Sequence, residues 1–214
     1  MTKAEKVFEL LKTDYPEAEC GLDYRTPFQL LVATMLSAQA TDKSVNAVTK
    51  ELYKEYPDLA SFLKLSQEEI EEKIKKIGLY KNKSRNIYNM CRELMERYNG
   101  DVPKNMEDLI SLSGVGRKTA SVVLVEAFNI PAFPVDTHVF RLTKRIGLAK
   151  GSTADKVSDE MMSKLPKYKY HLMHHLLITH GREICTAQKP NCNKCSLKNL
   201  CKYYKENVVK GKDK

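Results

Sequence analysis

LSGVGRKTA, residues 112–120, is the stretch that decides the fold. Gly114 and Gly116 allow a tight turn with positive φ and a close approach of the backbone to another molecule. The helix expected after them presents N–H groups that have no partner within the helix, at the positive end of its dipole. These features predict a hairpin between two helices that binds a phosphate without reading the base sequence. An ordinary helical hairpin is an equally weighted alternative. A nucleotide-triphosphate loop is excluded, because G-x4-G-K-[ST] is absent.

Helical periodicity continues from this turn toward both ends of the chain, and no convincing period-2 strand appears. Thr2 with Glu5 and Ser66 with Glu69 have the spacing of capping boxes, and Asp42 is a further expected cap. Thr26-Pro27 starts an apolar helix that is expected to be central and buried, and Asn99-Gly100 ends another helix. Further helices are expected at 105–112, 116–128, 136–146, 153–165 and 168–180. The sequence therefore predicts an all-α fold of about ten helices.

The amino-acid composition and net charge indicate which classes of binding partner to expect. The 214 residues include 36 Lys and Arg against 27 Asp and Glu, a net charge of +9, and 42% are hydrophobic. This excess of positive charge favours nucleic acid or an anionic membrane surface, with an inert basic surface as an even alternative. The first residues have neither a signal-peptide nor a transit-peptide pattern. The longest apolar stretch, residues 28–40, is too short to span a bilayer. We therefore expect a cytoplasmic protein with no membrane segment.

Four cysteines, Cys185, Cys192, Cys195 and Cys201, have the spacing C-x6-C-x2-C-x5-C. Cytoplasmic thiols stay reduced, so this cluster predicts a metal site and not disulfides. Polar neighbours within 191–199 argue against four buried core cysteines. Zinc and iron-sulfur both remain open, since only one short C-x2-C pair is present. A rival ligand set, His171, His174 and His175 at helical spacing, is disfavoured because no further ligand follows them.

Two residues could carry chemistry. Lys118, beside Arg117 at the start of the helix after the hairpin, is either a phosphate contact or a nucleophilic amine that forms a Schiff base. Asp136 is placed to cap the helix at 136–146, which is the favoured interpretation from the sequence alone. The alternative is a carboxylate that acts as a base and stabilises a developing cation at a sugar carbon.

Five motifs, taken together, resemble the endonuclease III branch of the helix-hairpin-helix glycosylase superfamily. They are LSAQATD at 36–42, IGLY at 77–80, SGVGRKTA at 113–120, VDTHVFR at 135–141 and the cysteine spacing. The motifs occur in the family's order and cover roughly residues 1–202. The resemblance implies two helical domains with a DNA-binding cleft between them. Residues 21–130 would form the hairpin domain, and residues 1–20 and 131–202 the cluster domain. Apart from the resemblance, the Lys-rich and mostly polar composition of residues 203–214 predicts a frayed basic tail.

The resemblance also implies an enzyme of base excision repair that removes oxidised pyrimidines from duplex DNA and cleaves the abasic strand by β-elimination. It makes Lys118 the Schiff-base nucleophile and Asp136 its carboxylate partner, and it implies a [4Fe-4S] cluster on the four cysteines. Gln39 would fill the gap left by an extruded base, and Leu79 would wedge into the stack on the opposite side. Gly114, Gly116 and Arg117 would contact DNA. The implied partner is double-stranded DNA with damaged bases or abasic sites, bound by a monomer.

One departure from the family pattern concerns Ser113, which stands where many relatives have proline, and we expect it to loosen the start of the hairpin. Two alternative functions stay open. Mispair adenine glycosylases share the cluster but lack the lysine and usually carry a further domain, so Lys118 and the short chain argue against that class. A non-enzymatic iron-sulfur DNA-binding redox sensor would use Lys118 only as a phosphate contact.

Overall fold

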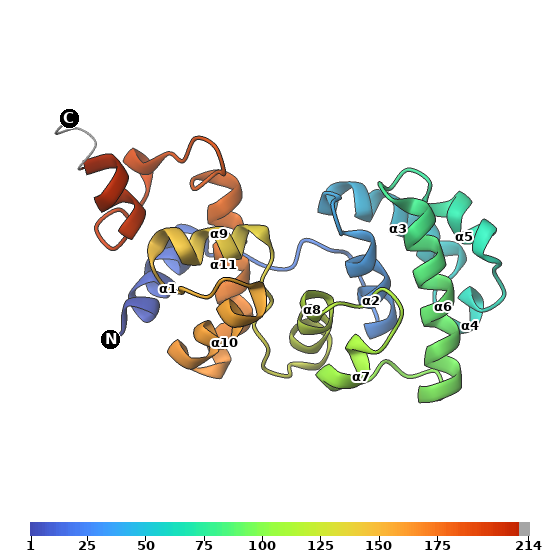
Figure 1. Cartoon of the computed structure of the whole chain (residues 1–214). Coiled ribbons are helices and arrows are strands. Elements are labelled where there is room, and N and C mark those ends of the chain that lie inside the picture. Colours follow the sequence, from blue (N-terminus) through green and yellow to red (C-terminus); the bar gives the residue numbers. More distant parts are fainter. Residues whose placement is uncertain (210–214) are drawn as a thin grey trace. The chain divides into compact units, whose positions relative to one another are not determined.

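Helices make up the regular secondary structure of the protein. The computed structural model describes residues 1–209, and no β-strand occurs in that part of the chain. The chain divides into two units (Figure 1). Residues 21–130 form the first, named here the hairpin unit. Residues 1–20 and the chain from residue 131 onward form the second, named here the cysteine unit. None of the described helices is long and apolar enough to cross a membrane.

The hairpin unit is built around a buried helix, α2, as predicted. Every side chain from Phe28 to Leu36 is buried, and α2 packs against α3, α6 and α8. Pro27 occupies the first turn, where its missing N–H costs nothing. The helices of this unit are α2 (Pro27–Leu36), α3 (Asp42–Glu55), α4 (Leu59–Phe62), α5 (Gln67–Ile74), α6 (Tyr80–Tyr98), α7 (Met106–Ile110) and α8 (Arg117–Phe128).

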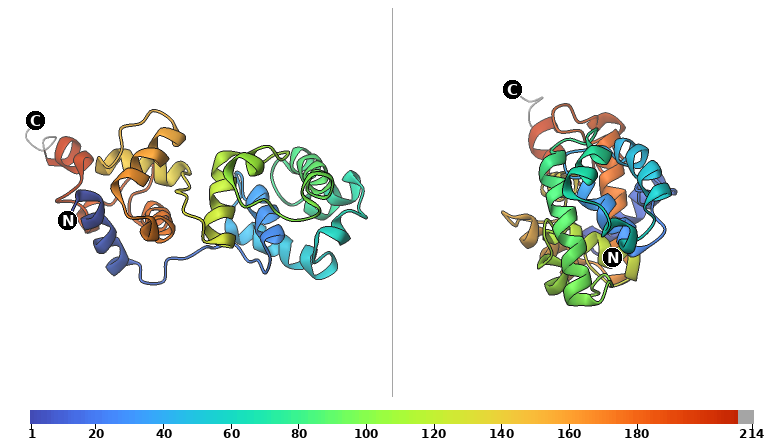
Figure 2. Two further views of the ribbon diagram at one scale, coloured as in Figure 1. Left: turned by 90° about the horizontal axis from the view of Figure 1, so that it is seen from below. Right: turned by 90° about the vertical axis from the view of Figure 1, so that its right-hand side faces the viewer.

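The cysteine unit joins the N-terminal helix to the C-terminal half of the chain. Helix α11 packs against both α9 and α1 (Figure 2). Val7 and Leu11 of α1 share one apolar core with Leu142 and Leu176. This burial explains how the N-terminal segment is held in the unit although residues 21–130 separate it from the rest. The elements of this unit are α1 (Lys3–Asp14), α9 (Thr137–Ile146), α10 (Ala154–Lys164), η1 (Lys167–Lys169), α11 (Tyr170–Glu183), η2 (Cys192–Lys194) and η3 (Tyr204–Val209).

The predicted helix ends are mostly confirmed. Both capping boxes are present, at Thr2 and at Ser66. Asn99 ends α6 in the left-handed conformation. The prediction for Asp42 is wrong: Thr41 is the cap, its hydroxyl accepts the N–H of Ser44, and Asp42 is the first residue of α3. A carboxylate in a first turn still interacts favourably with the helix dipole, so the two positions have similar sequence signals.

The expectation of a frayed basic tail from residue 203 is wrong for its described part. Tyr203 and Tyr204 pack against the core of the cysteine unit, and a π-helix follows over Tyr204–Val209. The ring of Tyr203 also lies under the guanidinium of Arg145, 4.9 Å from its centroid. Two aromatic side chains supply enough apolar surface to anchor a segment whose other residues are charged. The rest of the predicted tail, 210–214, lies outside the described residues.

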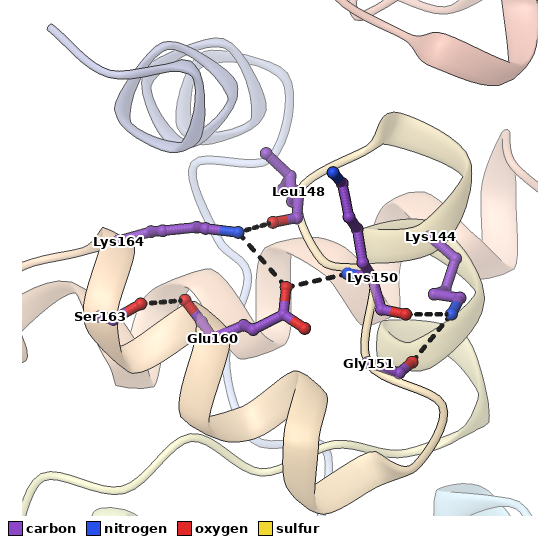
Figure 3. Close-up of polar contacts among 7 residues, drawn as sticks. All are labelled: Lys144, Leu148, Lys150, Gly151, Glu160, Ser163 and Lys164. Atoms are coloured by element: carbon purple, nitrogen blue, oxygen red, sulfur yellow. Dashed lines mark hydrogen bonds and ion pairs between the residues drawn. The ribbon is translucent and has the colours of Figure 1, made fainter.

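The loop between α9 and α10 is fixed by lysines that bind carbonyl groups (Figure 3). Lys144 Nζ donates to the carbonyls of Lys150 and Gly151, both at 2.8 Å. Glu160 of α10 accepts the N–H of Lys150 at 2.9 Å, and Lys164 Nζ donates to the carbonyl of Leu148 at 2.5 Å. Backbone carbonyl and N–H groups of the residues that follow α9 are thus hydrogen-bonded to side chains of α9 and α10.

Candidate functional site

The hairpin predicted from residues 112–120 is present between α7 and α8. Gly114 has φ +76°, and a Cβ there would lie 2.7 Å from Cβ of Asn86 in α6, so both conformation and space require glycine. Leu112 and Val115 are buried beneath the turn. Gly116 caps α8 without a side chain, and a Cβ on it would meet nothing within 4 Å. The glycine at 116 therefore leaves the first turn of α8 without a covering side chain, as an anion site requires.

Ser113 does not loosen the start of the hairpin, contrary to expectation. Its N–H and its hydroxyl both donate to the carboxylate of Glu93 in α6, at 2.7 and 2.6 Å. A proline at this position would have no N–H to offer. Serine and Glu93 together hold the turn against α6 by two hydrogen bonds to a charged acceptor, which are stronger than bonds between neutral groups.

The two residues expected to carry the chemistry lie in different units. Lys118 is the second residue of α8 in the hairpin unit and is half-buried, whereas the neighbouring Arg117 is exposed. Asp136 is half-buried in the cysteine unit and caps α9, its Oδ1 accepting the N–H of Val139 at 2.8 Å. Capping occupies one oxygen of Asp136, and Oδ2 has no hydrogen-bond partner among residues 1–209. The capping role is confirmed, and it leaves a carboxylate oxygen available for chemistry.

Gln39 and Leu79 both occupy exposed loops of the hairpin unit and both have strained backbones. Gln39 has φ 57° and Leu79 has φ 60°. The other non-glycine residues with positive φ in the described chain are Asn99 and Asn129, and asparagine tolerates that conformation. Leu79 exposes 54% of its surface although it is a large apolar residue. Strain together with an exposed apolar side chain indicates a functional loop and not a packing position.

The four cysteines line one hollow in the cysteine unit. Its apolar walls include Ile146, Leu197 and Tyr203. The expectation that polar neighbours keep the thiols out of an apolar setting is wrong: Leu197 is fully buried and Cys201 belongs to the core. Burial raises the pKa of the Cys195 thiol to about 11. It also raises the pKa of Cys192, with the charges of Cys185 and Cys201 as further causes. Four cysteine sulfurs that line one hollow fit a metal centre, which supplies the positive charge that favours thiolates.

Three residues around this hollow carried no signal in the sequence. Arg145 places Nη1 3.5 Å from Sγ of Cys185 and donates to the carbonyls of the following two residues, Thr186 and Ala187. His180 places Nε2 3.4 Å from Sγ of Cys195, and its Nδ1 lies 2.9 Å from the hydroxyl of Tyr15. Burial lowers the pKa of His180 to about 4. Donors beside sulfur ligands orient them and tune the metal that they bind.

The three histidines at helical spacing are packed together on α11. The ring centroids of His171 and His175 lie 5.0 Å apart, as do those of His174 and His175. His174 is buried, and its Nδ1 lies 3.0 Å from the carbonyl of Pro134.

Known proteins resemble this chain over nearly its full length. Residues 32–167 match the family described as HhH-GPD superfamily base excision DNA repair protein. Endonuclease III of Rickettsia prowazekii is 47% identical over 93% of this chain and 94% of its own. Endonuclease III of Escherichia coli strain K12 is 43% identical over 97% and 99%.

Solved structures of endonuclease III bound to DNA also resemble this chain over nearly its full length. A trapped endonuclease III–DNA covalent intermediate aligns with a TM-score of 0.91 and 42% identity, covering 97% of this chain and 99% of that chain. A non-covalent endonuclease III–DNA complex aligns with a TM-score of 0.90 and 42% identity over the whole of both chains. The likeness therefore extends from sequence motifs to the arrangement of helices. The chain belongs to the endonuclease III family, within the HhH-GPD superfamily of base excision DNA repair proteins.

Proposed function

We propose that this protein removes oxidised pyrimidines from duplex DNA and then cleaves the abasic strand. The observation that carries the proposal is the similarity, over nearly all of both chains, to an endonuclease III that was trapped covalently on DNA. Lys118, at the start of the helix after the hairpin, supplies the amine that such a covalent bond needs. The protein would act as a monomer on chromosomal DNA in the cytoplasm.

Lys118 forms and resolves the covalent bond in this proposal. Its neutral amine attacks the sugar C1′, the bond from C1′ to the base breaks, and the base leaves with a proton. The C1′–O4′ bond of the sugar then breaks and O4′ takes up a proton, while the amine nitrogen gives up its remaining proton as the C1′=N bond forms. That imine acidifies C2′, so removal of a C2′ proton expels the 3′ phosphate by β-elimination. Base removal and strand cleavage thus share one intermediate.

Asp136 acts as the carboxylate partner. Its Oδ1 is committed to the N-terminus of α9, which fixes the side chain in one orientation. Its Oδ2 remains available to accept a proton from the attacking amine and to stabilise positive charge at C1′. The same carboxylate would therefore be a cap and a catalytic group.

The strained loops of the hairpin unit act on the base before the chemistry begins. A base stacked in a duplex is out of reach and must be extruded at a cost of a few kcal/mol. Leu79 would wedge into the stack and Gln39 would fill the gap left by the extruded base. Gly114, Gly116 and Arg117 would hold the phosphate backbone.

The cysteine hollow holds a [4Fe-4S] cluster in this proposal, with Cys185, Cys192, Cys195 and Cys201 as ligands. The convergent thiols, the apolar walls and the nearby Arg145 suit a cluster whose ligand shell carries net negative charge. Such a cluster links the chain after α11 into one folded region. Purified protein should contain iron and acid-labile sulfide in equal amounts and absorb visible light. Colourless folded protein that was prepared anaerobically with iron supplied and contains one zinc would contradict it.

Borohydride trapping on a duplex with one oxidised pyrimidine tests the catalytic assignment. The wild type should become covalently linked to DNA, and Lys118→Gln should not, although its binding should stay close to normal because one positive charge of a net +9 is lost. A protein that only senses DNA would never be trapped. Asp136→Asn retains a capping side chain, so its melting temperature should be nearly unchanged while single-turnover cleavage falls by roughly 100-fold or more. Near-normal cleavage by Asp136→Asn would remove the carboxylate from the chemistry.

A further inference from the structure

A buried lysine of the hairpin unit, Lys83, connects the two strained loops. It lies in the first turns of α6, and its backbone N–H donates to the carbonyl of Leu79 at 3.1 Å. Its side chain reaches the other loop, where Nζ donates to the carbonyls of Leu36 at 2.8 Å and Ala38 at 2.6 Å. Those carbonyls come at the end of α2 and directly before Gln39. One residue is therefore bonded to both loops.

The burial of Lys83 is costly for a side chain that only holds a loop. It is 6% exposed, and burial lowers its pKa. No carboxylate pairs with it in the described chain, and its partners there are the two carbonyls. An ammonium without a counter-charge loses hydration that neutral acceptors only partly replace. The C-terminal end of the α2 dipole offsets part of this cost.

The strain in the two loops needs a restraint of this kind. A left-handed backbone at a residue other than Gly, Asn or Asp persists only where surrounding contacts enforce it. Around Gln39 the backbone is otherwise fixed by local bonds, such as the N–H of Ala40 to the carbonyl of Ser37 at 3.1 Å. Among residues 1–209, the hydrogen bonds from Lys83 Nζ reach this segment from far along the sequence, across 47 and 45 residues.

We propose that Lys83 is a positioning residue that holds the Gln39 loop in register with the Leu79 loop, so that both enter the base stack together. The inference rests on the proposed roles of Gln39 and Leu79 in base extrusion. Lys83 itself touches no substrate in this account. It fixes the positions of the Gln39 and Leu79 side chains before they enter the base stack.

Lys83→Met tests this inference, because methionine has a similar length and no charge. Lys144→Met in the cysteine unit is the matched control: that lysine also donates to two carbonyls, in the loop of Figure 3, and the substitution removes the same charge. Single-turnover removal of an oxidised pyrimidine should slow by about 10–100-fold in Lys83→Met, since misplacements near 1 Å have effects of that size. Cleavage at a pre-formed abasic site, where no base is extruded, should change by less than about threefold. Lys144→Met should leave both rates within about twofold of wild type.

Two further measurements separate positioning from general stability. Amide hydrogen exchange over residues 37–41 should accelerate in Lys83→Met and not in Lys144→Met. The double variant Gln39→Ala/Lys83→Met should remove bases no more than about twofold slower than Gln39→Ala alone, because both changes disable one loop. If Lys83→Met does not fold, Lys83→Gln takes its place: its amide keeps a polar group in the fold but is shorter than lysine, so the same selective slowing of base removal is expected at reduced size.

Base removal by Lys83→Met at the rate of Lys144→Met would overturn the inference. Equal losses on damaged and abasic DNA, or losses that multiply in the double variant, would do the same. Normal base removal by both Gln39→Ala and Leu79→Ala would also overturn it, since the loops would then have no role to coordinate. That outcome is distinguishable from failure of the proposed enzyme, because trapping through Lys118 would persist.

Discussion

Replacing Glu93 by alanine should loosen the hairpin at residues 112–120, and the contacts of Glu93 give the expected size of the effect. The carboxylate of Glu93 accepts the N–H and the hydroxyl of Ser113 at 2.7 and 2.6 Å, and it has no other partner among the described residues. A hydrogen bond to a charged group contributes about 1.5–3 kcal/mol when buried. Both residues are only half-buried, so water competes for these bonds. We therefore expect a loss of about 2 kcal/mol for the pair.

Thermal and urea unfolding with a double-mutant cycle measure this loss. For a chain of this size, 2 kcal/mol corresponds to a fall in melting temperature of about 4–8 °C. Glu96→Ala is the control: Glu96 is exposed on the same helix, and its replacement removes the same charge and changes helix propensity equally. Ser113→Pro removes both donors, so Glu93→Ala should cost almost nothing further in that background.

Two results would refute this reasoning. Equal melting temperatures for Glu93→Ala and Glu96→Ala would show that the bonds to Ser113 contribute nothing beyond surface charge. An undiminished cost of Glu93→Ala in the Ser113→Pro background would place the role of Glu93 elsewhere.

Three further predictions concern DNA affinity and the cysteine unit. Binding to undamaged duplex should weaken steeply with salt, by about 0.9 in log affinity per log salt for each phosphate neutralised, and a flat dependence in a titration would contradict phosphate binding at the hairpin. The N–H of Lys150 lowers the pKa of Glu160, so the stabilisation by Glu160 is complete above its ordinary value of 4.5 and is lost as pH falls through the lowered pKa. The wild type should accordingly have a higher melting temperature than Glu160→Gln at neutral pH, and this difference should disappear in acid. A difference that does not change with pH would show that the ionisation of Glu160 does not stabilise the fold. Cys195→Ala should lose iron and lower the melting temperature, whereas the rate per folded molecule at an abasic site should stay within about threefold of wild type; a purely catalytic defect would contradict a structural cluster.

The sequence predicted those features that depend on neighbours along the chain. The hairpin at 112–120, the capping boxes and the buried α2 all follow from residues that lie close together in the sequence, and all are present. Asp42 was misplaced by one position because Thr41 and Asp42 are both good caps. The tail was misjudged because composition does not reveal that Tyr203 and Tyr204 find an apolar core.

The features that the sequence did not predict depend on partners far apart along the chain. Glu93 pairs with a serine 20 residues on, and Arg145 reaches the cysteine loop 40 residues on. His180 meets Tyr15 across 165 residues. In a single sequence each of these is an ordinary helical side chain, since its partner is set by packing and not by spacing. The departure at Ser113 was visible in the sequence, but its compensation by Glu93 was not.

Helix α6 shows how periodicity and long-range contact combine in the hairpin unit. Leu79 precedes the helix, and Lys83, Asn86 and Glu93 follow at intervals of four, three and seven, which place them along one face. Lys83 binds the loop that ends in Gln39, Asn86 lies against Gly114, and Glu93 holds Ser113.

That face therefore contacts, in order, each segment of the hairpin unit that is proposed to touch DNA. A rigid helix fixes the spacing between these segments more firmly than the loops themselves could. The substitutions most damaging to DNA handling in this unit should thus fall on that face as well as on residues that meet the DNA, and Met95, on another part of α6, should tolerate replacement because it is 44% exposed.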